Sequence, residues 1–382
     1  MFSRLYIHIP FCRQKCPYCA FFSQELSTGA LDQYTELLCT EMSLVAEQIS
    51  MRHELDSIYF GGGTPSLMDP RQAARLLEQA AHLFGLAPHA EITLEANPGT
   101  VDYRRLAESR QSGINRLSLG VQSFDDRMLA TLGRIHTAQE AQTAFAAARQ
   151  ANFTNIGIDL INSLPGQTRE MWHTDLEQAL RLAPEHLSVY GLTVEEDTSF
   201  ATRYTENSPL LPDEDQSAEM FETADDLLCS HGYEHYEIAN YALPGFRSRH
   251  NSGYWHRDGY LGLGAGAHSY LRDTGYGTRF SNVADLDEYA RALNSGKLPR
   301  RDILQLSRED ALAEHMFLGL RMSDGVDFKT FERLFGITLP EVYGQKLELL
   351  LSQQLLSSDT NAVHLTRRGM LLSNQVFSHF LP

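Results

Sequence analysis

The sequence predicts an α/β protein in which a partial (β/α)6 barrel precedes a mainly helical, winged-helix-like C-terminal domain. Through the first half of the chain, short runs of β-branched and aromatic residues alternate with longer amphipathic segments, which is typical of parallel βα units. Cysteine, glycine, carboxylate and amide residues follow the ends of these runs, where the loops of a βα barrel build a site. From about residue 300 the pattern becomes mainly helical.

Six short strands and five amphipathic helices are predicted for the barrel. The predicted strands are Leu5–Ile9, Ser57–Phe60, Glu91–Leu94, Arg116–Gly120, Ile156–Ile161 and Leu187–Leu192. The predicted helices are Leu31–Ile49, Pro70–Phe84, Val101–Ser112, Ala138–Ala151 and Arg169–Leu182. Six units of this kind favour a barrel or a three-quarter barrel over an open sheet.

Beyond about residue 205 the pattern changes, and we expect two further regions. Further strands are expected at His235–Tyr241 and Tyr260–Leu271 around a glycine-rich stretch. A capping box that begins at Ser307 precedes a helix, and Leu339–Leu356 is strongly amphipathic; Val363–Thr366 is expected in a small hairpin. We therefore expect a barrel over residues 1–205, barrel-extending strands over 206–298 and a helical domain over 299–382.

Composition excludes several classes of protein. The 382 residues are 42% hydrophobic and 21% charged, as in soluble globular proteins, and their net charge of −17 opposes binding to nucleic acid. The tail from residue 301 carries 8 basic and 10 acidic residues, so we interpret it as a packing and partner-docking domain. The first residues open a strand rather than a signal peptide, and no run of 18 apolar residues occurs. We expect a cytoplasmic protein without a transmembrane segment, in which peripheral membrane contact stays open.

Cys12, Cys16 and Cys19 follow the first predicted strand with the spacing C-x3-C-x2-C. Three thiolates on one loop can bind three irons of a [4Fe–4S] cluster and leave the fourth iron open to a small molecule. Structural zinc would need a fourth ligand from Cys39 or Cys229, each isolated in a helical pattern. Disulfides fit less well, because the cysteine count of five is odd and the three residues are crowded.

Polar residues at the ends of later strands suit a zwitterionic nucleoside. Gly61–Gly63 leave backbone groups open to a ligand, and Thr64 adds a hydroxyl group. The remaining residues supply two carboxylates, an amide and a guanidinium that can grip a carboxylate. They are Glu95, Asp159, Gln122 and Arg134.

The cysteine loop resembles that of the radical S-adenosylmethionine superfamily. Four segments resemble the coproporphyrinogen III oxidase-like branch of that superfamily. They are Tyr6–Cys12, Gly61–Pro65, Gly120–Phe124 and Asp159–Gly166. The resemblance implies that Cys12, Cys16 and Cys19 ligate the cluster, which an electron donor would reduce. It implies S-adenosylmethionine contacts from Tyr6, Tyr18, Gly62, Gly63, Thr64, Glu95, Gln122, Arg134 and Asp159.

Two departures distinguish the chain from the oxidases of this branch. The oxidases carry a further cysteine two positions after the third, where this chain has Phe21, and a longer segment before the first strand. The segment His250–Trp255 instead resembles the H-N-x-x-Y-W signature of haem chaperones in the same branch. This resemblance implies haem contacts from His250 and Tyr254, with His256 and His268 as alternatives; without it, a buried structural turn is the favoured interpretation.

The function expected from these features is a haem chaperone that transfers haem to acceptor proteins. The alternative is an oxygen-independent coproporphyrinogen III oxidase, a radical enzyme that decarboxylates a porphyrinogen. A barrel with only a structural metal is a third possibility. The sequence does not decide between an enzyme and a carrier, nor does it give the oligomeric state.

Overall fold

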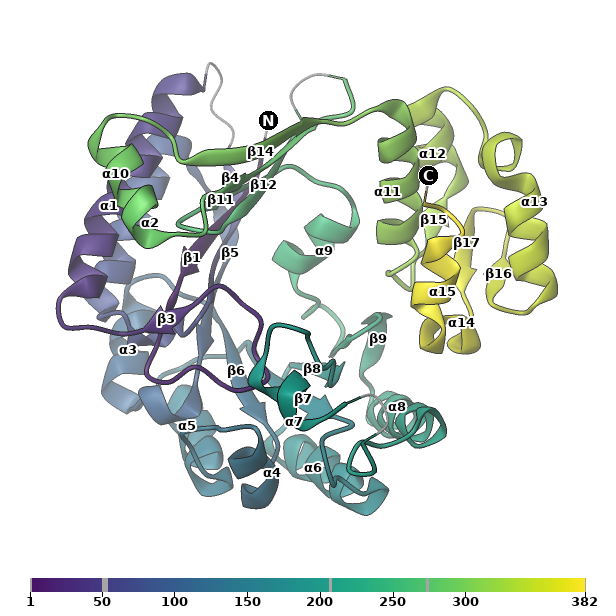
Figure 1. The fold of residues 1–382 in the computed structure, drawn as a ribbon, viewed down its shortest axis with the longest axis horizontal. Coiled ribbons are helices and arrows are strands. Elements are labelled where there is room, and N and C mark those ends of the chain that lie inside the picture. Colours follow the sequence, from purple (N-terminus) through teal and green to yellow (C-terminus); the bar gives the residue numbers. More distant parts are fainter. Residues whose placement is uncertain (1, 50–53, 206–207, 273–274, 382) are drawn as a thin grey trace.

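The computed structural model describes residues 2–49, 54–205, 208–272 and 275–381, and its main feature is one large curved sheet (Figure 1). The strand order in this sheet is β14-β13-β12-β11-β1-β4-β5-β6-β7-β8-β10-β9. Its parallel strands are β11 (Tyr260–Leu263), β1 (Arg4–Ile9), β4 (Leu55–Gly62), β5 (Leu86–Ala96), β6 (Arg116–Gln122), β7 (Ile156–Asn162) and β8 (His186–Gly191). All six predicted barrel strands lie in this parallel run, so the predicted fold class is confirmed.

Helices follow these strands, and most of them cover the outer face of the sheet, as expected for βα units. The helices are α1 (Ala30–Gln48), α2 (Pro70–Phe84), α3 (Tyr103–Gln111), α4 (Asp126–Thr131), α5 (Ala138–Gln150), α6 (Arg169–Leu182), α7 (Ser199–Arg203) and α8 (Glu214–Ser230). Helices α4 and α7 instead pack with Tyr18 of the cysteine loop. Short 3-10 turns η1 (Pro65–Leu67) and η2 (Pro98–Thr100) follow β4 and β5. The cysteine loop runs through a small parallel pair, β2 (Phe11–Cys12) and β3 (Gln24–Glu25).

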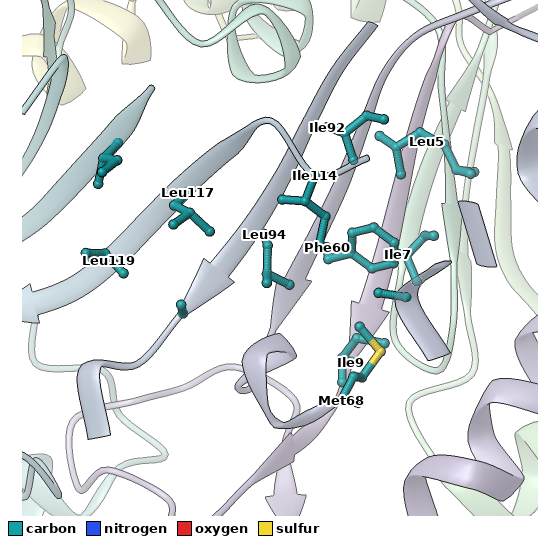
Figure 2. Close-up of a cluster of buried hydrophobic side chains, with 14 of the residues drawn as sticks. Leu5, Ile7, Ile9, Phe60, Met68, Ile92, Leu94, Ile114, Leu117 and Leu119 are labelled. Carbon is teal, nitrogen blue, oxygen red and sulfur yellow. The ribbon is translucent and has the colours of Figure 1, made fainter. Parts of the chain in front are cut away.

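The two faces of the barrel strands differ in chemistry. Successive side chains of a strand point to opposite faces, so Leu5, Ile7 and Ile9 of β1 all point outward into one apolar cluster with the helices. Figure 2 shows these residues beside Leu94 of β5 and Leu117 of β6. The alternate positions, which face the barrel interior, are polar or aromatic. They are Tyr6, His8, Ser57, Tyr59, Glu91, Thr93, Glu95, Arg116, Ser118, Asp159, His186 and Ser188.

The region after the barrel contains hairpins where single strands were predicted. The segment His235–Tyr241 divides into β9 (Glu234–Glu237) and β10 (Asn240–Ala242), which pair antiparallel. The expected strand Tyr260–Leu271 is also divided, into β11 and β12 (His268–Leu271), because Gly264 adopts a left-handed φ of 99° and turns the chain. Strands β13 (Thr278–Asn282) and β14 (Arg300–Gln305) complete this edge, with α10 (Leu286–Asn294) between them.

The C-terminal region has its own apolar core and a three-stranded sheet. Its elements are α11 (Arg308–Gly319), β15 (Val326–Asp327), α12 (Phe328–Phe335), α13 (Leu339–Ser352), β16 (Leu356–Ser358), β17 (Ala362–Leu365), α14 (Arg367–Leu371) and α15 (Ser373–Ser378). Strand β17 pairs antiparallel with both β16 and β15, so the small hairpin predicted there is confirmed. The predicted helix Leu339–Leu356 ends earlier, and its last predicted residue opens β16. This core begins at Ala311, whereas β14 (Arg300–Gln305) pairs with β13 in the large sheet, so the boundary near residue 299 stays a proposal.

Helix α9 (Arg249–Trp255) lies between the barrel strands and α11 (Figure 1). It contains the H-N-x-x-Y-W segment, for which a buried turn was the interpretation without the family resemblance. The segment forms a short helix instead, and the Ser248 side chain caps this helix by accepting from the Asn251 backbone N–H. None of the helices in the described part of the chain combines the length and apolar character that crossing a bilayer requires.

Candidate functional site

The cysteine loop leaves the barrel at the carboxyl end of β1 and is fixed by backbone hydrogen bonds to the glycine-rich turn after β4. The Gly63 N–H donates to the Ile9 carbonyl at 2.9 Å, and the Thr64 N–H donates to the Phe11 carbonyl at 2.8 Å. A Cβ atom at Gly63 would lie 2.8 Å from the Phe11 oxygen and 3.0 Å from the Cys12 Sγ atom. Glycine at position 63 therefore permits the loop to approach the turn closely.

A cavity of about 380 Å³ lies at this end of the barrel. Its lining includes all three cysteines of the motif and all but one of the residues predicted to contact S-adenosylmethionine. These residues are Tyr18, Gly62, Gly63, Thr64, Glu95, Gln122, Arg134 and Asp159. Tyr6 is the exception, because it lies deeper in the barrel, where its hydroxyl is 2.9 Å from His8 Nδ1. The structure thus gathers residues from the cysteine loop and from β4, β5, β6 and β7 around one space.

Two half-buried carboxyl groups face this cavity. Glu95 accepts hydrogen bonds from the Tyr59 hydroxyl at 2.7 Å and from the Gly62 N–H at 3.2 Å. The pKa of Glu95 is raised to about 7, mainly by burial and to a lesser extent by the nearby Asp159 carboxylate. Burial also raises the pKa of Asp159, which accepts from the Ser118 hydroxyl. Two carboxyl groups with raised pKa values suit a ligand that brings positive charge or hydroxyl donors.

Arg134 bridges the cavity wall and the cysteine loop. One of its Nη atoms donates to the Gly120 carbonyl at 2.7 Å, the other is 3.7 Å from Cys16 Sγ, and its buried Nε has no hydrogen-bond partner among the described residues. Gln122 lines the same wall with a φ of 72°, which is unusual for a residue other than glycine and is found most often at functional sites. These groups place a cation and an amide beside the thiols.

The structure adds lining residues that the motifs did not identify. Ser118 and Tyr190 face the cavity from β6 and β8. Ser118 lies two positions before Gly120 and Tyr190 lies four positions after His186, so the period-two alternation of the strands places both on the inner face. That alternation was the available signal; Asn97, whose place at the end of the third strand was visible in the sequence, also lines the cavity, as does Lys15 of the cysteine loop.

His250 and Tyr254 do not line this cavity. His250 is fully buried at the opposite end of the barrel interior, and its two ring nitrogens lie 2.8 Å from the Ser57 hydroxyl and 2.8 Å from the Tyr254 hydroxyl. Burial lowers the pKa of His250 to about 3, and the nearby Arg4 and Arg116 act in the same direction. In this arrangement neither residue presents a free ligand atom, so the haem contacts stay predictions; His256 and His268, the two alternatives, are exposed.

The donor set fits a [4Fe–4S] cluster with one open iron. Three thiols line the cavity, while Cys39 is buried on α1 and Cys229 is exposed on α8, so neither supplies a fourth thiolate there. Burial raises the pKa of the Cys19 thiol. Within the described ranges no three His, Cys, Asp or Glu side chains converge on a point suited to a single ion; a cubane does not need this, because each thiolate binds a different iron.

Comparisons with known proteins agree with this geometry. A model of the radical SAM superfamily matches residues 6–179, and a model of the HemN C-terminal domain matches residues 306–372. Proteins described as "Heme chaperone HemW" are similar over nearly the whole chain. That of Lactococcus lactis is 39% identical over 98% of this chain and 96% of its own length, and that of Escherichia coli is 35% identical over 99% and 97%.

Among solved structures, the coproporphyrinogen III oxidase HemN of Escherichia coli is similar over 99% of this chain and 90% of its own chain, with a TM-score of 0.85 and 25% sequence identity.

A third sequence relative, the HemW of Bacillus subtilis, is 37% identical over 98% of each chain. The chain therefore belongs to the radical SAM superfamily and, within it, to the HemW family.

Proposed function

We propose that this protein is a haem chaperone, which binds haem together with a [4Fe–4S] cluster and S-adenosylmethionine and transfers haem to acceptor proteins. The full-length similarity to relatives named haem chaperones carries this proposal, since it includes the barrel, the α9 region and the C-terminal domain together. The exposed Phe21, at the position where the oxidases have a further cysteine, supports it.

The cavity residues differ in charge, and in this proposal each kind binds a different group. Cys12, Cys16 and Cys19 would hold the cluster, which supplies one-electron chemistry at its open iron when bound. Glu95 and Asp159 are placed to accept from the ammonium and hydroxyl groups of S-adenosylmethionine, and Arg134 to bind its carboxylate. These ligand assignments are part of the proposal.

The partners in this proposal are haem, haem-accepting proteins and an electron donor for the cluster. A cytoplasmic location is proposed because the five cysteines are free thiols in the structure, as a reducing compartment would keep them. Nucleic acid is not a proposed partner of a chain with a net charge of −17, and peripheral contact with a membrane stays a prediction.

Haem titration of the anaerobically reconstituted protein tests the main claim. We expect a saturable haem absorbance band, followed by transfer of haem to apomyoglobin as a probe acceptor. A protein loaded with cluster that shows no saturable band would contradict the proposal. Spectra of His250→Ala and Tyr254→Phe variants would show which of the predicted haem contacts matters.

Oxidase activity is the alternative function, since the fold resembles that of HemN, but the higher identity to the HemW proteins does not favour it. Incubation of the reconstituted protein with coproporphyrinogen III, S-adenosylmethionine and dithionite separates the two functions. We expect no decarboxylated porphyrinogen from this chain. Stoichiometric decarboxylation would instead support the oxidase.

A further inference from the structure

Helix α9 closes the barrel interior at the amino ends of the parallel strands, opposite the cavity. The carboxylate of Glu91 on β5 accepts from the backbone N–H groups of Arg249 at 3.0 Å and His250 at 2.9 Å. Arg4 of β1 donates to the Arg249 carbonyl and forms an ion pair with Asp258 at 3.0 Å. The first strand and the third predicted strand therefore both fix the position of α9.

A continuous series of contacts connects α9 to the cavity through the barrel interior. The buried His250 ring lies against the Tyr59 ring, with their centroids 5.1 Å apart at an interplanar angle of 30°. The Tyr59 hydroxyl, at the far end of the same side chain, donates to Glu95 Oε1 at 2.7 Å. Glu95 lines the cavity, so one tyrosine spans the distance between the signature helix and the ligand-facing carboxylate.

The other end of α9 contacts the C-terminal region. The Arg321 guanidinium, just after α11, lies over the Trp255 ring with its central carbon 4.3 Å from the ring centroid. Arg321 also lies 3.9 Å from the buried Glu237 carboxylate. A displacement of α9 would therefore alter the surroundings of Trp255.

We propose that Tyr59 and His250 are positioning residues that couple ligand occupancy at Glu95 to the position of α9. An ammonium or hydroxyl group bound at Glu95 competes with the Tyr59 hydroxyl for the same carboxylate oxygen. A change in the Tyr59 side chain reaches His250 directly, because a close-packed interior transmits such shifts. The inference rests on the S-adenosylmethionine binding in the proposed function, and it gives the signature histidine a role that needs no contact with haem iron.

Tryptophan fluorescence offers a direct test, because the chain has only two tryptophans, Trp172 and Trp255. Trp172 is buried on α6, where its indole N–H donates to the Met220 carbonyl, so Trp172→Phe leaves a single reporter on α9. The cluster-loaded Trp172→Phe protein is titrated with S-adenosylmethionine, and binding is measured in parallel by equilibrium dialysis. We expect a saturable change in Trp255 emission with the same midpoint as binding.

Two further variants in the same background separate coupling from binding. Tyr59→Phe keeps the ring contact with His250 but removes the competing bond to Glu95; we expect the Kd for S-adenosylmethionine to fall roughly three- to tenfold and the Trp255 response at saturation to disappear. Ser57→Ala removes a partner of His250 without touching Glu95, and we expect a reduced response at nearly unchanged affinity. Tyr103→Phe, at an exposed position on α3, is the matched control and keeps both quantities.

The outcomes are distinct. Binding of S-adenosylmethionine without any change in Trp255 emission would overturn the coupling and leave the proposed function intact, as would an unchanged response in both Tyr59→Phe and Ser57→Ala. Absence of binding to the cluster-loaded protein would overturn the proposed function and the coupling together.

Discussion

The two ends of the barrel interior contain similar polar side chains but differ in what those side chains face: one end is closed by helix α9 and the other opens on the cavity. At the closed end, both ring nitrogens of His250 are in hydrogen bonds, and Glu91 accepts from two backbone N–H groups of α9. At the cavity end, the buried Nε of Arg134 has no partner in the described part of the chain and Glu95 faces open space. Satisfied groups hold the structure together, whereas unsatisfied groups beside a cavity are available to a ligand.

Arg116 qualifies this contrast, because it lies deep in the barrel with Nε and Nη1 unpartnered by any described residue. Its charge is balanced by the neighbouring Glu91 carboxylate, which raises the pKa of the guanidinium against the opposing effect of burial. The closed end is thus stabilised partly by charge pairing and not by hydrogen bonds alone.

The largest effect is expected at the cavity end from Cys12→Ser. Serine is a poor iron ligand at neutral pH, so the iron content after anaerobic reconstitution should fall from about four atoms per chain to nearly none. Iron and sulfide analysis with the absorbance spectrum measures this. The matched control is Cys229→Ser, since Cys229 is exposed on α8 outside the cavity and should keep the full iron content. Full cluster loading of Cys12→Ser would refute the ligand assignment.

At the closed end, His250→Ala should reduce the free energy of unfolding by about 3 kcal/mol. The substitution leaves a cavity in a close-packed interior and removes the partners of Ser57 and Tyr254. Urea denaturation of the two proteins measures the difference. His256→Ala, at an exposed position beside α9, should change stability by less than about 0.5 kcal/mol. A His250 variant as stable as the wild type would show that the closed end is not a structural unit.

The same contrast explains which features the sequence could predict. Apolar residues at every second position identified strands such as Leu5–Ile9, and the cysteine spacing and glycine turns located the cavity end, because those patterns are local. The partner groups at the closed end are not local: His250 contacts Ser57, nearly two hundred residues earlier in the chain. No single-sequence pattern reports such a pair, so neither the contact between His250 and Ser57 nor the hairpin turn at Gly264 was predicted.

A third prediction concerns pH and the half-buried carboxyl group of Glu95 at the cavity. The folded protein raises the pKa of Glu95 from an ordinary value of 4.5 to about 7, so it holds that proton more tightly than the unfolded chain. The resulting stabilisation is complete below about pH 4.5 and is lost as the pH rises through 7. The stability of Glu95→Gln relative to the wild type should therefore increase by about 2 kcal/mol between pH 5.5 and pH 8.5. Thermal unfolding at the two pH values checks this; equal differences at both would contradict the raised pKa.

The smallest effect is expected from Arg134→Lys at the cavity end, which should weaken ligand binding and leave the free energy of unfolding nearly unchanged. Arg134→Lys keeps the positive charge but loses the planar guanidinium that reaches both Gly120 and the Cys16 loop. We expect the Kd for S-adenosylmethionine to rise about tenfold, which corresponds to about 1.4 kcal/mol, with a change in unfolding free energy below about 1 kcal/mol. Equilibrium dialysis and urea denaturation give the two numbers.

Arg127→Lys provides the control for Arg134→Lys, since Arg127 is exposed on α4 and pairs with Asp125. That variant should change neither the affinity nor the stability appreciably, because exposed ion pairs contribute little. If Arg134→Lys destabilised the protein and left the affinity unchanged, Arg134 would belong with His250 among the structural groups. The unpartnered Nε would then not mark a ligand-binding residue, and the distinction between the two ends of the barrel would rest on the carboxyl groups alone.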